Sequence, residues 1–134
     1  MDRFEVDDLA SLIEPLRTEA ENKIKRELSG PLNVGKRLLY NAIMPLHVNI
    51  TSESHQCCLE FLAEGNIRLK RNLDVNPDVI VVGEIETIRC LTIHGSTKMF
   101  EESERKGEIS IISHTWKGEQ AIQKVRDLLK SRQQ

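Results

Sequence analysis

Between residues 46 and 73 the sequence alternates apolar and polar side chains with a period of two. Successive side chains of a β-strand point to opposite faces, so this alternation predicts strands with one apolar face. Three alternating runs joined by tight turns predict an antiparallel meander with one face toward solvent, in which Glu60 lies opposite Arg68 or Lys70. The runs cover residues 46–50, 57–63 and 67–73, and the turns lie at 51–54 and 64–66.

Two further strands are predicted downstream of the meander. Residues 79–82 are apolar at every position, which indicates a strand that is either central in its sheet or covered on both faces. The isoleucines within 109–112 predict a fifth strand. Residues 84–95 and 96–105 separate these strands and have the apolar spacing of two short helices.

The N-terminal part predicts a helix over residues 4–29, divided into two pieces. Pro15 is tolerated best in the first turn of a helix, so we expect a break near Glu14. Beyond the break the apolar residues recur at every fourth position, a narrow stripe that suits a helix lying over a sheet or against a partner. The stripe consists of Leu16, Ala20, Ile24 and Leu28.

Two other segments complete the organisation. Residues 32–45 predict a short helix or an irregular crossing that ends at Pro45. The C-terminal segment predicts an amphipathic helix with Ala121, Ile122, Val125, Leu128 and Leu129 on one face. No internal repeat or low-complexity linker divides the sequence, so we expect one domain over 1–134, with an N-terminal helical segment (1–45) and an α+β core (46–130).

Charge and composition exclude several classes of function. Nineteen Lys and Arg against twenty-one Asp and Glu give a net charge of −2, which supplies no broad positive field for nucleic acid. The longest apolar run is far too short to span a bilayer, so no integral membrane association is expected. The charged N-terminus and three cysteines, an odd number, favour a soluble protein of the reducing cytoplasm.

The cysteines and histidines do not form a recognisable metal or redox motif. Cys57 and Cys58 are adjacent on a predicted strand and point to opposite faces, so they cannot chelate one ion together. We expect Cys57 in the core and Cys58 half-exposed. His47 and His55 flank the first predicted hairpin, where a shared metal is the less favoured alternative to two solvent-facing histidines. The sequence therefore predicts no metal and no cofactor.

Catalytic motifs are also missing. The sequence contains no nucleophile elbow, no phosphate-binding glycine loop and no dinucleotide-binding fingerprint. Carboxylates gather around the fourth predicted strand, at Asp74, Asp78, Glu84 and Glu86. Such residues are usually solvated in turns, and we interpret them in that way. The sequence therefore favours a binding protein over an enzyme.

From residue 46 onward the order of elements resembles the sterol carrier protein (SCP-like) domain family. The resemblance covers about residues 46–130 and rests on two motifs, Pro77-Asp78-Val79-Ile80-Val81-Val82-Gly83 and Gly107-Glu108-Ile109-Ser110-Ile111-Ile112. Two short helices lie between these motifs, and an amphipathic helix follows the second. The sequence departs from the family at Ser113-His114, where a glycine is usual, and lacks an aromatic residue just before Gly107. These departures leave the identity of any ligand open.

The resemblance implies a mostly antiparallel five-stranded sheet with helices packed on it, enclosing an apolar tunnel. It further implies that the protein binds a lipid or another small apolar ligand without catalysing a reaction. The residues that would line this tunnel come from the inward strand positions and the helices that face them. They are Val48, Ile50, Leu59, Phe61, Leu69, Ile88, Leu91, Met99, Phe100, Ile122, Val125 and Leu129.

Periodicity does not distinguish the wall of a cavity from an ordinary filled core. The alternative is therefore a protein-interaction or homodimerisation module with a filled core. It is motivated by the apolar stripe and by residues 32–45, which need a surface to cover. A third alternative, an enzyme that uses the cysteine and histidine residues or the turn carboxylates, has the least support in the sequence.

Overall fold

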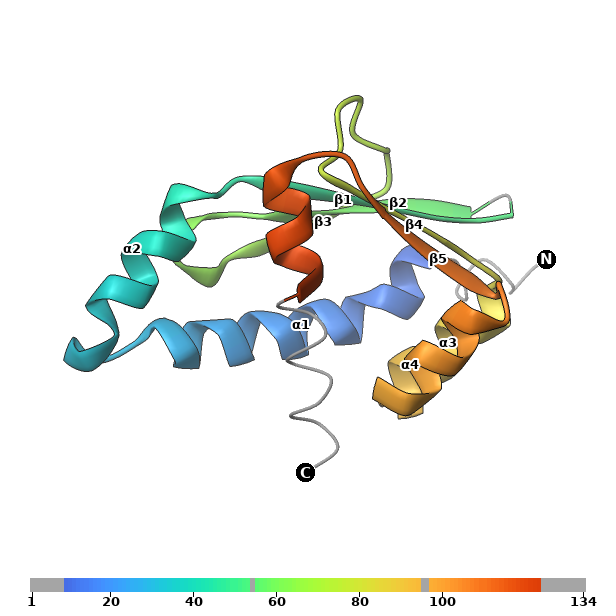
Figure 1. Cartoon of the computed structure of the whole chain (residues 1–134), viewed down its shortest axis with the longest axis horizontal. Helices are drawn as coiled ribbons and strands as arrows, with labels where there is room; N and C mark the ends of the chain where they lie inside the picture. Colours follow the sequence, from blue (N-terminus) through green and yellow to red (C-terminus); the bar gives the residue numbers. More distant parts are fainter. Residues whose placement is uncertain (1–8, 54, 95–96, 124–134) are drawn as a thin grey trace.

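The computed structural model describes residues 9–53, 55–94 and 97–123. Its centre is one five-stranded sheet with the strand order β3-β2-β1-β4-β5. Helices pack on this sheet, so the predicted α+β class and mostly antiparallel five-stranded sheet are confirmed (Figure 1). The strands are β1 (Leu46–Ser52), β2 (His55–Phe61), β3 (Ile67–Lys70), β4 (Val79–Gly83) and β5 (Ile109–Ser113).

The first three strands form the predicted antiparallel meander. Glu60 pairs with Arg68 across the β2–β3 ladder, and the Arg68 Nη1 and Glu60 Oε1 atoms are 3.3 Å apart. The sequence did not predict how β4 joins this meander. It pairs in parallel with β1 and antiparallel with β5, so β4 is an internal strand of the sheet. This placement explains why residues 79–82 are apolar throughout.

Helix α1 (Leu9–Leu28) runs along one face of the sheet (Figure 1). The predicted break near Glu14 is wrong, because the chain remains helical through Pro15. A proline inside a helix costs about 3 kcal/mol, whereas burying one aliphatic side chain contributes about 1.5–3 kcal/mol. Buried side chains on both sides of Pro15 therefore outweigh its cost. They are Leu9, Ala10 and Ile13 before it, and Ile24 and Leu28 after it.

Helix α2 and the pair α3 and α4 lie at opposite ends of the molecule (Figure 1). A 3₁₀ turn, η2 (Pro31–Asn33), leads from α1 into α2 (Val34–Ala42), so the short-helix alternative for 32–45 is correct. The predicted helical pair corresponds to α3 (Ile85–His94) and α4 (Thr97–Arg105). Residues 116–123 are helical, while the predicted apolar positions Val125, Leu128 and Leu129 lie outside the described residues.

The outer face of the sheet, opposite α1, is only partly open to solvent. Cys58 lies on this face and is 0% exposed, which corrects its prediction as half-exposed. The 71–78 segment covers it, and Asn49 holds this segment by bonding both the N–H and the carbonyl of Asp74, each at 2.9 Å. Burial raises the pKa of the Cys58 thiol, so this side chain is a poor nucleophile at neutral pH.

Hydrogen bonds and close packing at Asp78 connect three parts of the chain. It is 6% exposed, so its interpretation as a solvated turn carboxylate is wrong. Its carboxylate accepts hydrogen bonds from the backbone N–H of His47 at 2.9 Å and from the Thr115 hydroxyl at 2.8 Å. Gly118 approaches the Asp78 carbonyl so closely that a Cβ would lie 2.2 Å from the oxygen. The start of β1, the start of β4 and the chain after β5 therefore meet at Asp78.

The two histidines considered for a metal site lie at opposite ends of the first hairpin. His47 pairs with Glu60 near the start of β1, whereas His55 pairs with Ser52 beside the turn, so a shared metal is ruled out. The His47 Nε2 and Glu60 Oε2 atoms are 2.9 Å apart, and this hydrogen bond lowers the pKa of Glu60 below its ordinary value. Across residues 9–53, 55–94 and 97–123, no cluster of three His, Cys, Asp or Glu side chains is placed to hold a metal.

The uninterrupted helix predicts the effect of replacing its internal proline. We expect Pro15→Ala to stabilise the protein by about 1–3 kcal/mol, because alanine restores a helical N–H donor and has the highest helix propensity. Pro15 is exposed, so the change removes no core contact. Urea unfolding followed by circular dichroism measures the effect, and Ser11→Ala, an exposed position one turn earlier, is the control. A Pro15→Ala protein less stable than the wild type would show that the helix depends on the proline.

Candidate functional site

A cavity of about 260 Å³ lies between the sheet and the helices α1, α3 and α4. Ligand-binding pockets commonly have volumes of roughly 300–1,000 Å³, so this cavity is near the lower end of that range. The layer between the sheet and the helices, for which the sequence left a cavity or a filled core open, thus contains a space of this size.

The sheet forms the floor of the cavity through the residues that point toward α1. Every strand contributes, because residues of the same parity face the same side of the sheet. Val48 of β1, Val81 of β4 and Ile111 of β5 point to the inner face of the sheet. They are only half-buried because they border the cavity. The floor residues are Val48, Ile50, Leu59, Phe61, Ile67, Val81, Ile109 and Ile111.

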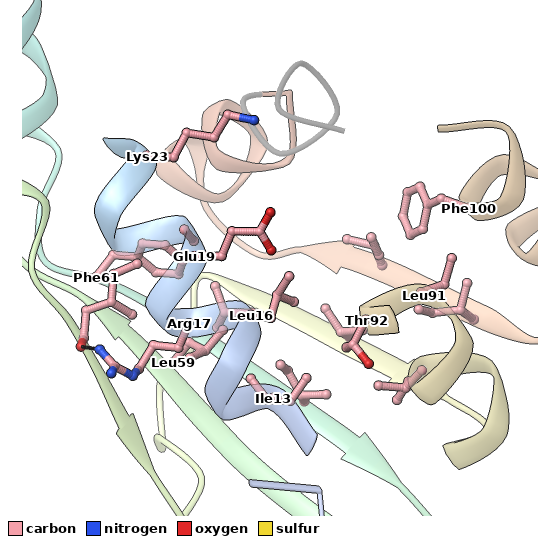
Figure 2. Close-up of a pocket in the computed structure, with 18 of the residues that line it drawn as sticks. Ile13, Leu16, Arg17, Glu19, Lys23, Leu59, Phe61, Leu91, Thr92 and Phe100 are labelled. Carbon is pink, nitrogen blue, oxygen red and sulfur yellow. Dashed lines mark hydrogen bonds between the residues drawn. The ribbon is translucent and has the colours of Figure 1, made fainter. Parts of the chain in front are cut away.

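The helices form the walls. Figure 2 shows Leu16 of α1 and Leu91 of α3 projecting into the space, with Phe61 and Phe100 on opposite sides of it. The exposed residue Glu19 and the half-buried residues Lys23 and Thr92 belong to α1 and α3. The accessible side of the cavity therefore lies between these two helices.

Seven of the twelve residues expected from the sequence line the cavity. They are Val48, Ile50, Leu59, Phe61, Ile88, Leu91 and Phe100. Leu69 packs against the core cluster outside the lining, and Met99 and Ile122 are half-buried elsewhere. Val125 and Leu129 lie outside the described residues.

The sequence did not indicate the contribution of α1 to the cavity. Ile13, Leu16, Ala20 and Ile24 line the cavity, although three of them belong to the apolar stripe that was assigned to a sheet or a partner. The repeat at every fourth residue was the signal for one helix face, but it did not indicate which strand residues that face would meet. The inner residues of β4 and β5 were missed as well. Only the parallel pairing of β1 with β4 shows which of their residues face the same side of the sheet as Val48 and Ile50.

Polar contacts to the edge strand fix the position of α1. Arg17 donates from Nη1 to the carbonyl of Ile67 at 3.0 Å, and Glu21 accepts from the Ile67 N–H at 2.8 Å. Arg17 also bridges to Glu14 and Glu21, at 2.7 and 3.2 Å. Side chains of α1 thus bond to the N–H and the carbonyl of Ile67. Without α1 these two backbone groups would face solvent at the edge of the sheet.

Two of the polar side chains that line the cavity, Thr92 and Arg17, form hydrogen bonds with other parts of the protein. The Thr92 hydroxyl donates to the Arg89 carbonyl at 2.9 Å, and the Arg17 guanidinium is held by Glu14, Glu21 and Ile67. The rest of the lining is aliphatic and aromatic apart from Glu19 and Lys23. The lining of the cavity is therefore mainly apolar.

In the described part of the chain, no helix combines the length and the apolar character that a bilayer crossing requires. Several solved structures share the fold of this chain. The solution structure of palmitated SCP2L2 from Aedes aegypti has a TM-score of 0.55 and 14% identity, and the match covers 91% of this chain and 94% of that chain. The solution structure of sterol carrier protein domain 2 of Helicoverpa armigera also has a TM-score of 0.55, with 13% identity and coverage of 90% and 89%.

A third structure, described as a UbiJ-SCP2 ubiquinone synthesis protein, has a TM-score of 0.52 and 14% identity, and the match covers 87% of this chain and 98% of that chain. No protein-family model matches the sequence, and no curated protein matches it significantly. The chain therefore has the sterol carrier protein fold, and the resemblance found in the sequence is confirmed for the fold.

The contact between Glu21 and Ile67 predicts a pH-dependent stability. The Ile67 N–H holds the pKa of Glu21 below its ordinary value, although burial opposes this shift. The ionised carboxylate therefore stabilises the folded state above the unfolded pKa of about 4.3, and this contribution is lost as the pH falls through the lower folded pKa.

We expect Glu21→Gln to lower the free energy of unfolding by about 1–2 kcal/mol at pH 7, with the difference from the wild type shrinking below about pH 4. Urea unfolding at several pH values measures this difference. Glu101→Gln, at an exposed position of α4, is the control and should change little. An equal effect of Glu21→Gln at every pH would contradict a role for the charge.

Proposed function

We propose that this protein binds a lipid or another small apolar ligand in the cavity between the sheet and α1, α3 and α4, and that it carries this ligand without chemical change. The observation that carries the proposal is the apolar cavity, whose lining side chains come from five strands and three helices. The fold supports it, because a structure with the same fold is described as palmitated.

We infer the reducing cytoplasm as the compartment of this protein from the three cysteines, of which Cys90 is exposed.

The energetics of an apolar cavity favour an apolar occupant. An apolar lining that is left in contact with water stays unfavourable, because burial of apolar surface stabilises a protein by about 25 cal/mol per Å². Each methylene buried from water contributes about 0.8 kcal/mol, so a chain of ten carbons supports micromolar binding.

The first experiment is a native mass spectrum of freshly purified protein, followed by organic extraction. We expect a reproducible additional mass that extracts as a lipid or another apolar compound. Protein that shows only its own mass, and that also fails to bind dodecanoate or dodecanol in calorimetric titrations, would refute the proposal. Comparison of these two probes shows whether a charged head group contributes to binding.

A larger side chain on α1 should fill the cavity and compete with a ligand. Ala20 lines the cavity and is half-buried, so the ring of Ala20→Phe would occupy space that the ligand needs. We expect this variant to bind dodecanoate or dodecanol at least about tenfold more weakly, while its unfolding midpoint stays the same or rises. Ala63→Phe, the same substitution at an exposed position, is the matched control and should bind like the wild type. Undiminished binding by Ala20→Phe would place the ligand elsewhere.

A further inference from the structure

The two edges of the sheet differ in how their backbone groups are bonded. At β3 the outward N–H and carbonyl of Ile67 bond to Glu21 and Arg17 of α1. At the opposite edge, β5 pairs with β4 alone among the strands of the described residues. Open strand edges pair readily with further strands, so proteins usually protect them. The edge at β5 is therefore the place where a further strand can join this sheet.

The hydrogen bonds at the two ends of the β4–β5 ladder show which backbone groups of β5 point outward. The Glu84 N–H bonds to the Glu108 carbonyl at 3.0 Å, and the His114 N–H bonds to the Asp78 carbonyl at 2.8 Å. In an antiparallel ladder every second residue bonds to one neighbouring strand, and the N–H and carbonyl of the residues between them point to the other side. The residues of β5 whose backbone groups point away from β4 are therefore Ile109, Ile111 and Ser113.

Strand β5 lacks the features that usually keep an edge strand from pairing. Residues 109–113 include neither a charged residue nor a proline. The ladder between β4 and β5 is continuous and has no bulge. Natural edge strands are commonly protected by lysine, by proline or by a bulge. Ile112 is instead 48% exposed on the outer face, and isoleucine favours β-strands. The strand is therefore suited to pairing along its open edge.

We propose that two copies of this chain pair antiparallel along β5, so that their sheets join across a twofold axis at Ile111. About this axis Ile111 pairs with Ile111 of the second copy, and Ile109 pairs with Ser113 of the second copy. Each outward N–H and carbonyl of these residues then has a partner, and a shifted antiparallel register leaves some of them unpaired. The interface uses the edge of the sheet and does not depend on the ligand proposed above.

The side chains that meet beside this axis are complementary. Ser110 of one copy lies opposite Ile112 of the other, and both side chains are exposed in the single chain. Glu108 of one copy lies opposite His114 of the other, where the carboxylate can accept a hydrogen bond from the imidazole. Like charges do not lie opposite one another in this arrangement. The edge is thus complementary to itself, which is the requirement for a twofold interface.

The length of the strand predicts a weak dimer. A standard interface takes about 20–30 residues from each partner, whereas this contact centres on a strand of 5 residues. Interfaces at the low end of the size range belong to transient complexes. We therefore expect a dissociation constant on the order of 10 µM, so that monomer and dimer exchange in solution.

Sedimentation velocity of the full chain from about 1 to 500 µM tests the proposal, because these concentrations lie on both sides of the expected dissociation constant. We expect monomers at the lowest concentration and dimers at the highest. Ser110→Lys combined with Ile112→Lys places lysines opposite one another across the axis and should weaken dimerisation by at least about tenfold. Both positions are exposed and lie outside the cavity lining, so the unfolding midpoint should not change.

The matched control adds the same charge at two exposed aliphatic positions outside β5, Leu32→Lys combined with Val75→Lys, and should dimerise like the wild type. The cavity variant Ala20→Phe should also dimerise normally, which separates this proposal from the ligand proposal. A monomer at every concentration, or undiminished dimerisation of the β5 lysine variant, would overturn the pairing. A dimer that only the control pair dissociates would overturn it as well.

A second pair of variants tests the backbone contact without adding charge. Ser113→Pro removes one outward N–H, and proline is tolerated in an edge strand where its nitrogen faces away from the sheet. We expect Ser113→Pro to weaken dimerisation. Ser113→Ala removes the same hydroxyl, which donates to Glu119 at 2.8 Å, but keeps the N–H, so it should dimerise like the wild type. An equal loss in both variants would contradict pairing through the backbone.

Discussion

Side chains of one helix bond to both the backbone N–H and the carbonyl of Ile67, and the position of the cavity depends on these contacts. Ile67 belongs to an edge strand, where the outward N–H and carbonyl have no neighbouring strand. Glu21 and Arg17 of α1 bond to them at 2.8 and 3.0 Å. Hydrogen bonds to charged groups contribute more than neutral ones, about 1.5–3 kcal/mol each. Helix α1 is thereby fixed over β3 and cannot slide inward to fill the space beside α3.

The opposite wall is fixed independently. Helix α3 follows β4 almost directly, and the backbone N–H of Glu84 bonds to the carbonyl of Glu108 at 3.0 Å, which ties the start of the helix to β5. A Cβ at Gly83 would lie 3.2 Å from the Ile109 side chain, so the chain passes closely there. With α1 attached to one edge of the sheet and α3 to the other side, neither wall closes the cavity without breaking these contacts.

The sequence predicted the elements whose pattern is local. Strand parity assigned Val48, Ile50, Leu59 and Phe61 to the inner face, because one tight turn joins β1 directly to β2. It did not predict the parallel pairing of β1 with β4, which joins residues 31 positions apart along the chain. The inner positions of β4 and β5 and their relation to α1 depend on this pairing. The sequence could therefore indicate an apolar layer but not the space within it.

The outer face was misjudged for a different physical reason. The residues of the 71–78 segment have no periodic pattern, so nothing in the sequence predicts that it folds back over the sheet. A few individual hydrogen bonds hold this segment: two between Asn49 and the backbone of Asp74, and others to the backbone of Asp78. Burial of Cys58 and Asp78 follows from these bonds. The continuity of α1 through Pro15 was missed similarly, because burial on both sides of the proline is a tertiary effect.

The burial of two adjacent cysteines on opposite faces of β2 has a consequence for observing the molecule in motion. Cys57 lies in the core cluster with α1, whereas Cys58 lies beneath the 71–78 segment, and both are 0% exposed. A thiol reagent reaches Cys57 only when the helical layer separates from the sheet, and reaches Cys58 only when the covering segment lifts. The rates at which the two sulfurs are alkylated therefore report the opening of two layers separately, with exposed Cys90 as the internal reference.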